Sequence, residues 1–313
     1  MAALNLILSQ YLIPSRNVYM PSFTDTYRNQ LSLYFQLGKF RLCTLVLFTT
    51  LVGYGLGVNK WDLFEIFSLL LGTLLTAMGA NGLNQWWERE RDAKMARTRN
   101  RPLPLGKLSA NHALFITSSW SVIGITLLFF GVNTLTAYLA TLTIVTYLFI
   151  YTPMKPYSPI AVLAGAVPGA IPPMMGWTAA TNTFSVQAWV LGCLLFLWQI
   201  PHFMSLAAVY RQDYARGGYH LLPDNPEVDR VTRSIIVIFS LALLGITLLA
   251  PSIGLGQRLF FVSALFLGGG MLFISIKLYT KYSIENARRM FRASIIYIPT
   301  LMIFLLIDER LFG

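Results

Sequence analysis

Residues 64–92 read FEIFSLLLGTLLTAMGANGLNQWWERERD, an apolar stretch that ends in a dense group of charged side chains. Its apolar part, 64–86, has the length of a membrane-spanning helix, because about 20 apolar residues cross the hydrocarbon core of a bilayer. Asn84, Glu88 and Asp92 stand four residues apart, so a helix that continues to Asp92 places all three side chains on one face. The stretch therefore predicts a membrane helix that carries polar groups to the membrane surface.

Similar apolar segments lie on both sides of this stretch. We expect nine transmembrane helices, at residues 40–58, 64–86, 112–131, 134–152, 158–179, 187–207, 233–250, 258–280 and 291–307. Helices are expected because backbone polar groups in lipid must be satisfied within the segment. Of the 313 residues, 55% are hydrophobic and 12% are charged, whereas a soluble domain carries about a quarter charged residues. The sequence predicts an all-α integral membrane protein with one nine-helix domain over 39–313, after a cytoplasmic or interfacial segment over 1–38.

The charge distribution supports this topology. With a cytoplasmic N-terminus, 21 of the 24 lysines and arginines fall on the cytoplasmic side, and only Lys60, Arg258 and Arg310 fall on the other. Such an excess is the positive-inside pattern of membrane proteins. It accounts for the net charge of +11 without a nucleic acid, so we expect no nucleic-acid partner. Cys43 and Cys193 lie in apolar segments and indicate neither a disulfide framework nor a metal site.

Two connections, about 87–111 and 208–232, are longer than the others, and both are expected on the cytoplasmic side. The first contains Glu88 and Asp92, follows closely on Asn84, and continues with three arginines, Arg97, Arg99 and Arg101. Mg²⁺ commonly takes one or two carboxylates and fills its other positions with phosphate and water, and arginine suits bidentate phosphate contacts. The pattern indicates a metal-bridged diphosphate. The alternative is a solvated, charged helix end, which does not explain an asparagine at membrane depth.

The second connection follows the run Trp198-Gln199-Ile200-Pro201-His202-Phe203. His202 comes after a proline inside an apolar segment, so it is either a ligand-binding residue or a hydrogen-bonded core residue. Asp213 opens the connection on the same side as Asp92, and it is either a second metal ligand or an ordinary loop acid. Upstream, three prolines and three glycines interrupt residues 165–177. They favour close packing of small residues between helices, with a ligand-lined break as the alternative.

These motifs carry a family resemblance that covers about residues 35–305. Asn-x-x-x-Glu-x-x-x-Asp followed by Arg-Thr-x-Asn-Arg-Pro-Leu resembles the first motif of the UbiA-type intramembrane prenyltransferases, in which an aspartate commonly stands in place of Glu88. Trp-Gln-Ile-Pro-His-Phe leading to Asp-Tyr-x-x-x-Gly is similar to the branch of that family that makes heme O. Other branches typically have Asp-x-x-x-Asp in the second motif, whereas Asp213 lacks that partner. Lys39-Phe40-Arg41 stands where many relatives have Lys-Pro-Arg, a difference to which we attach no function.

The resemblance implies a nine-helix bundle around a central cavity, capped by the two long connections. It implies transfer of the farnesyl group of farnesyl diphosphate to a vinyl group of heme b, with addition of water and release of diphosphate. The product is heme O for heme-copper oxidase assembly. Mg²⁺ is the implied cofactor, heme b is a substrate, and the implied metal and catalytic residues are Asn84, Glu88, Asp92 and Asp213.

The resemblance also suggests how the substrates bind. Residues expected to contact the diphosphate are Arg97, Arg101, Lys155 and Tyr214. Residues expected to hold heme are His202, Gln199 and Trp198, with His220 as a competing iron ligand, while His112 is expected to be structural. Trp86, Trp177 and Trp198 are candidates for stabilising an allylic cation.

The implied partners are the lipid bilayer and a heme A synthase or another oxidase assembly protein. The implied location is a bacterial plasma membrane or a mitochondrial inner membrane. One alternative is an enzyme of the same fold that prenylates a quinone precursor or a chlorophyll-like ring, which would not need the run from Trp198 to His202. A transporter is a second alternative, but the sequence lacks the internal inverted repeat of many transporters.

Overall fold

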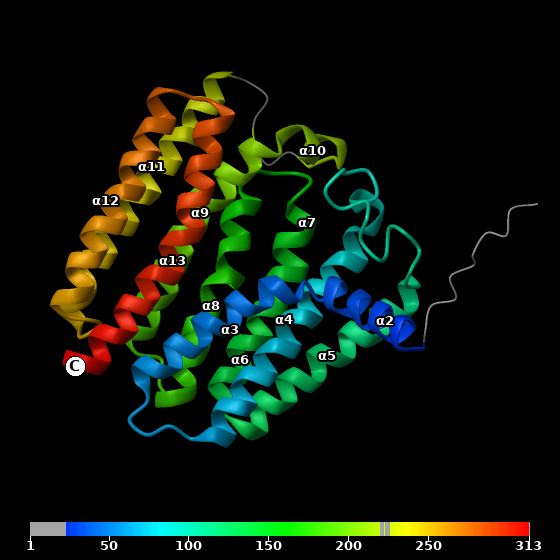
Figure 1. Cartoon of the computed structure of the whole chain (residues 1–313), viewed down its shortest axis with the longest axis horizontal. Coiled ribbons are helices and arrows are strands. Elements are labelled where there is room, and N and C mark those ends of the chain that lie inside the picture. Colours follow the sequence, from blue (N-terminus) through cyan, green and yellow to red (C-terminus); the bar gives the residue numbers. More distant parts are fainter. Residues whose placement is uncertain (1–22, 220–221, 223–225, 313) are drawn as a thin grey trace, which may run out of the picture.

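The computed structural model describes residues 23–219, 222 and 226–312 (Figure 1). The elements, in chain order, are α2 (Phe23–Leu37), α3 (Phe40–Gly57), α4 (Leu63–Asp92), α5 (Ala110–Gly131), α6 (Thr134–Val145), η1 (Thr146–Tyr151), α7 (Thr152–Met154), α8 (Ala161–Thr181), α9 (Val186–Val209), α10 (Arg211–Arg216), α11 (Pro226–Leu249), η2 (Ala250–Ile253), α12 (Arg258–Thr280) and α13 (Ile284–Phe312). No strand occurs in this part of the chain.

Every predicted segment corresponds to a helical stretch of the bundle. Among the described residues, eight stretches are long and apolar enough to cross a membrane. The segment predicted at 158–179 is the exception. It forms α8, a helix of 21 residues that packs against α3, α6 and α9, but its prolines and glycines lower its mean hydropathy. The all-α membrane fold is confirmed, with eight spans by composition and α8 as a ninth long helix.

Close backbone contacts hold α8 in the bundle. A methyl group added to Gly176 would overlap the backbone oxygen of Thr50, and one added to Gly53 would overlap that of Pro173. Only glycine allows α3 and α8 to approach this closely. These contacts support the small-residue packing interpretation of residues 165–177.

The segment predicted as a regular helix at 134–152 contains a feature that the sequence did not indicate. After α6, residues Thr146–Tyr151 form a π-helical turn, and α7 follows directly. Such turns insert one extra residue per turn and often occur at functional sites. Here the turn precedes Thr152, whose hydroxyl donates to the backbone oxygen of Tyr147 at 2.8 Å.

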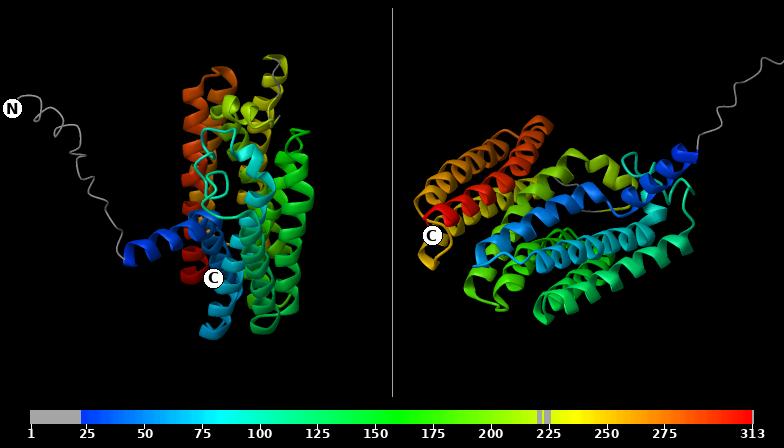
Figure 2. Two further views of the ribbon diagram at one scale, coloured as in Figure 1. Left: turned by 90° about the vertical axis from the view of Figure 1, so that its right-hand side faces the viewer. Right: turned by 60° about the horizontal axis from the view of Figure 1, so that its bottom comes forward.

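The two ends of the bundle differ. At one end, α10 lies beside the loop that follows α4 (Figure 1). The last residues of α2 accept from Gln85 of α4, and α2 runs at a steep angle to the long helices (Figure 2). An interfacial role for 1–38 remains a prediction.

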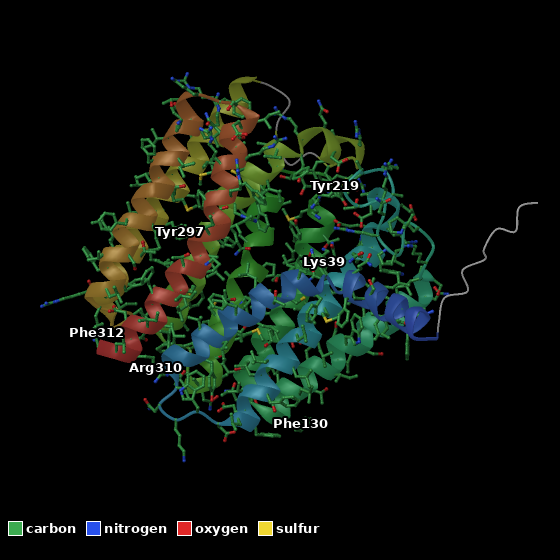
Figure 3. The ribbon with its side chains drawn as sticks, viewed as in Figure 1. Lys39, Phe130, Tyr219, Tyr297, Arg310 and Phe312 are labelled. Atoms are coloured by element: carbon green, nitrogen blue, oxygen red, sulfur yellow. The ribbon has the colours of Figure 1, made fainter. Side chains whose placement is uncertain are left out.

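At the opposite end, the last helix is tied to the first long one. Arg310 of α13 donates to the backbone oxygens of Gly55 and Val58, where α3 ends (Figure 3). The buried carboxylate of Asp308 accepts from the amides of Leu259 and Phe260, at 3.2 and 3.1 Å, and so caps the N-terminus of α12. These bonds join α3, α12 and α13 at this end of the bundle.

Candidate active site

The predicted polar face lies at the C-terminal end of α4. The side chain of Asp62, just before the helix, caps the amides of Phe64 and Glu65, and the helix continues to Asp92 as the spacing requires. The side chains predicted to share one face are all buried, with exposures of 1% for Asn84, 5% for Glu88 and 1% for Asp92. Buried charges need partners, and each of these three side chains has at least one.

Glu88 is paired with Lys155, which follows α7. The lysine Nζ lies 3.1 Å from both carboxylate oxygens, and the side chains are 13% and 5% exposed. The same ammonium lies over the rings of Tyr151 and Tyr219, 5.0 and 5.1 Å from their centroids. Desolvation alone would lower the pKa of Lys155, but the Glu88 carboxylate and the surrounding phenols outweigh it and hold that pKa well above its ordinary value. Lys155 is therefore charged at neutral pH.

Asp92 is paired with Arg101 in the loop that follows α4. The guanidinium donates to Oδ2 at 2.6 Å, and the Thr98 hydroxyl donates to the Asp92 backbone oxygen at 2.8 Å. The loop is thus folded back onto the helix end. The other carboxylate oxygen, Oδ1, is buried and has no hydrogen-bond partner among the described residues.

Asn84 is held by groups from three elements. Its amide donates to the Thr152 hydroxyl at 3.0 Å, and its Oδ1 accepts from Tyr147 and from Lys39, each at 3.4 Å. Lys39 has a left-handed backbone with φ of 50° at the start of α3 (Figure 3). Desolvation, together with the positive charges of Arg101 and Lys155, lowers the pKa of Lys39 to about 7. A third basic group therefore stands beside the two carboxylates.

Asp213, in the first turn of α10, does not share these contacts. Its two oxygens accept from the backbone amides of Ala96 and Arg97, at 2.7 and 3.1 Å. The Arg97 guanidinium in turn donates to the Tyr214 hydroxyl at 3.2 Å and lies over the Tyr214 ring. These bonds join the two predicted polar connections to each other. The predicted role of Asp213 as a metal ligand remains a prediction.

The donors at the end of α4 fit Mg²⁺. Among the residues that the structure describes, no three acidic, cysteine or histidine side chains come together as a metal site. Mg²⁺ does not require such a cluster, because it is commonly held by one or two carboxylates and by substrate phosphate. Oδ1 of Asp92, which no described residue contacts by a hydrogen bond, has the chemistry of a metal ligand, and Glu88 and Asn84 supply further oxygens on the same helix face.

The predicted heme residues lie on α9. The Trp198 indole donates to the Ser294 backbone oxygen at 2.7 Å, and the Gln199 amide donates to the Ala166 oxygen at 3.3 Å. Both side chains thus join α9 to neighbouring helices, while the His202 Nδ1 contacts the Ser294 hydroxyl at 2.9 Å. His220 lies outside the described residues. The contacts of His112, which pairs with the Tyr34 hydroxyl at 2.9 Å, agree with a structural role.

Sequence reasoning missed several residues of this site. Lys39 was visible only as one basic residue of a Lys-x-Arg pair before the first helix, and Tyr147 only as an aromatic in an apolar segment. Tyr219 (Figure 3) follows Gly218, whose φ of 71° turns the chain after α10. The Arg91 guanidinium lies over the Tyr219 ring, 5.6 Å from its centroid. The one available signal was the pair of glycines before this tyrosine, which predicts a turn.

Comparison with known proteins gives the family. The model of the UbiA prenyltransferase family matches residues 46–298. A protoheme IX farnesyltransferase of Solibacter usitatus is 39% identical over 286 residues, which are 88% of this chain and 98% of that protein. A mitochondrial protoheme IX farnesyltransferase of Arabidopsis thaliana is 36% identical over 279 residues, 88% of this chain and 64% of that protein.

Solved structures support the same fold. A structure described as digeranylgeranylglyceryl phosphate synthase superposes with a TM-score of 0.77 at 14% identity, over 90% of this chain and 99% of that one. A UbiA homolog of Archaeoglobus fulgidus, bound to DMAPP and Mg²⁺, superposes with a TM-score of 0.66 at 11% identity, over 89% of this chain and 99% of that one. With its motifs, its helical bundle and its close relatives, this chain belongs to the UbiA prenyltransferase family.

Proposed function

We propose that this prenyltransferase moves the farnesyl group of farnesyl diphosphate to a vinyl group of heme b, forming heme O. The observation that carries the diphosphate part is the group of buried charges at the end of α4. Two carboxylates, each held by its own cation, stand beside a third basic side chain. Asp92 Oδ1 has no partner among the residues that the structure describes. Neighbouring cations and a free carboxylate oxygen together suit a metal-bound diphosphate.

In this proposal the charged residues act on the leaving group. Mg²⁺, when bound, would neutralise negative charge on the diphosphate. Asp92, Glu88 and Asn84 would hold it, and Lys155, Arg101 and Lys39 would contact phosphate oxygens as charge builds on them. Arg97 and Tyr214, which already contact each other, would extend this contact from the second connection.

The acceptor part rests on the relatives, which are named protoheme IX farnesyltransferases. The bond between farnesyl carbon and diphosphate oxygen breaks, and a vinyl carbon of heme b forms the new carbon–carbon bond. The cation left beside the porphyrin takes up water, which loses a proton and becomes the hydroxyl of heme O. Heme O would then pass to a heme A synthase or another oxidase assembly partner.

We place the polar end, with α10 and the loop after α4, on the cytoplasmic side of a bacterial plasma membrane or on the matrix side of a mitochondrial inner membrane. The distribution of lysine and arginine supports this orientation. Farnesyl diphosphate would bring its charged head to this end and its apolar chain into the bundle.

The test is an assay of the products. The protein in detergent receives heme b, farnesyl diphosphate and Mg²⁺, and the extracted hemes are analysed by mass spectrometry. We expect a heme heavier by one farnesyl group and one water. Asp92→Asn should lower its formation by about 10²–10³, the typical effect of removing one electrostatic contact to the transition state.

Glu285→Gln is the matched control, because Glu285 is an exposed carboxylate at the start of α13 that pairs with the neighbouring Arg289 and Arg292. It should leave the rate unchanged. Unmodified heme from folded wild-type protein would refute the proposed acceptor. A prenylated quinone precursor in a parallel reaction would then assign the enzyme to another branch of the family and preserve the diphosphate site.

A further inference from the structure

The hydrogen bonds around His202 determine which ring nitrogen carries its proton. Ser294 of α13 has one hydroxyl proton, and its Oγ donates to the Phe291 backbone oxygen at 2.7 Å. Towards His202 the same oxygen, 2.9 Å from Nδ1, can therefore only accept. The proton of the neutral imidazole is then on Nδ1, and Nε2 carries a free lone pair.

Aromatic rings fix the orientation of this imidazole. The His202 ring stacks on Trp198 at a centroid distance of 4.9 Å and an angle of 25°. Phe291 covers it at 4.9 Å and 34°, and Phe203 meets it edge-on at 5.4 Å. Trp198 is itself fixed, because its indole donates to the Ser294 backbone. The imidazole is thus held by groups from α9 and α13.

The arrangement has the form of a histidine prepared to bind a metal. Metal-binding histidines usually donate their second ring N–H to an oxygen acceptor, which sets the tautomer and makes the binding nitrogen more basic. Among the described residues, Nε2 of His202 has no hydrogen-bond partner. It is also not one of the fully buried polar atoms. It is therefore accessible to a ligand from outside the protein.

The depth of His202 in the bundle suits an apolar ligand. It lies seven residues before the end of α9, which is about 10 Å along a helix at 1.5 Å per residue. The charged site described above lies at the polar end of the bundle. A flat apolar macrocycle bound at His202 would therefore lie among the apolar helices and not in the polar connections.

We propose that Nε2 of His202 binds the iron of the heme substrate, and that Ser294 is the positioning residue that keeps His202 in the Nδ1–H tautomer. This inference rests on the proposed function, since it takes heme b as the acceptor. It also accounts for the aromatic side chains around the imidazole, because they keep its ring plane fixed. Imidazole is the most common protein ligand of heme iron.

The test reads the iron ligand directly. The full chain in detergent is loaded with heme b, reduced, and examined by resonance Raman spectroscopy for the iron–histidine stretching band. We expect the band in the wild type, its loss in His202→Ala, and its return when imidazole is added to that variant. Restoration by free imidazole would not follow from a role limited to helix packing.

Ser294→Ala tests the positioning role. The substitution removes the hydroxyl that accepts the Nδ1 proton of His202, but it retains the Ser294 backbone oxygen to which Trp198 donates. The iron–histidine band should therefore shift, and the affinity for heme should fall about 10-fold. Ser275→Ala is the matched control. Ser275 is also fully buried, and its hydroxyl donates to an oxygen of its own helix, Leu272, at 2.7 Å. It should leave the band and the affinity unchanged.

The outcomes separate this inference from the proposed function. An unchanged band in His202→Ala, in protein that still makes heme O, would overturn the inference and preserve the function. An unshifted band and unaltered affinity in Ser294→Ala would overturn the positioning role. If the wild type neither binds heme nor makes heme O, both the inference and the heme acceptor are wrong.

Discussion

Replacing Lys155 with methionine tests the buried ion pair that anchors the end of α4. Methionine is similar in size and apolar, so the substitution removes the charge and keeps much of the packing. It leaves the Glu88 carboxylate, which is 5% exposed, without the ammonium 3.1 Å away. We therefore expect Lys155→Met to destabilise the protein strongly.

The burial of the pair determines the magnitude. Exposed ion pairs contribute about 0–1 kcal/mol, but removing one partner of a buried pair costs about 3–5 kcal/mol, because the other charge stays buried. The side chains of Lys155 and Glu88 are 13% and 5% exposed, so the buried figure applies. At about 2 °C per kcal/mol for a large domain, the melting temperature should fall by about 6–10 °C.

Thermal unfolding in detergent, followed by size-exclusion chromatography with fluorescence detection, measures this change. The part of the difference that comes from the charge of Lys155 itself should be constant from about pH 7 to about pH 9, whereas Lys39, whose pKa of about 7 is lowered in part by Lys155, adds a part that varies with pH. The pKa of Lys155 is raised in the folded state. Its contribution is therefore fully present below the unfolded-state pKa and is lost only as the pH rises through the folded-state value.

The double variant Glu88→Gln with Lys155→Met shows whether the stranded charge is the cause. It should recover most of the lost stability, since no unpaired charge remains. Lys281→Met, at an exposed lysine after α12, is the control and should stay within about 1 °C of the wild type. A fall below about 2 °C for Lys155→Met, or a double variant no more stable than the single one, would refute the reasoning.

Three further predictions follow from the site and from the helix packing. Chelation of Mg²⁺ should abolish farnesyl transfer and leave the melting temperature nearly unchanged, because the carboxylates of Glu88 and Asp92 already have protein partners. A large fall in melting temperature would indicate a structural metal. Asp213→Ala removes the acceptor of two loop amides, so amide hydrogen exchange at Ala96 and Arg97 should speed up as expected for a loss of about 1–3 kcal/mol in local stability. Unchanged exchange would show that Asp213 does not hold these amides. Gly176→Ala should destabilise the protein by about 1–3 kcal/mol, because the added methyl group overlaps α3. The control Gly245→Ala, whose methyl group meets no atom within 4 Å, should be neutral or stabilising in thermal melts, and equal melting temperatures for the two variants would show that α3 and α8 can separate at little cost.

The helices and the centre of the charged site could be predicted because both depend on local sequence. Apolar length alone locates the membrane segments, and a four-residue spacing places Asn84, Glu88 and Asp92 on one helix face whatever surrounds them. Lys155 and Arg101 were within reach of motif reasoning. Their pairing with Glu88 and Asp92 was not, because it depends on how the loops fold back.

The remaining features depend on tertiary structure. Lys39 joins the site because α3 begins beside α4, and no pattern near residue 39 encodes that contact. Asp213 has the composition of a metal ligand, yet in the structure its oxygens accept from backbone amides across 117 and 116 residues of chain. The π-helical turn before Thr152 likewise has no sequence signature, since its residues read as ordinary apolar helix.

The bonds from Arg310 to the end of α3 have a consequence for how the chain is assembled in the membrane. Helices enter the bilayer in order as the ribosome synthesises them, and the residue that closes the end of α3 lies in α13, 252 residues after Val58. Until α13 is inserted, the carbonyl groups of Gly55 and Val58 lack this donor, and Asp308 is absent from the start of α12. A chain interrupted before Arg310 would therefore contain every charged residue of the candidate site, but its helix bundle would not yet be closed at the opposite end. Nascent chains arrested just before and just after Arg310 would locate the step at which the bundle closes.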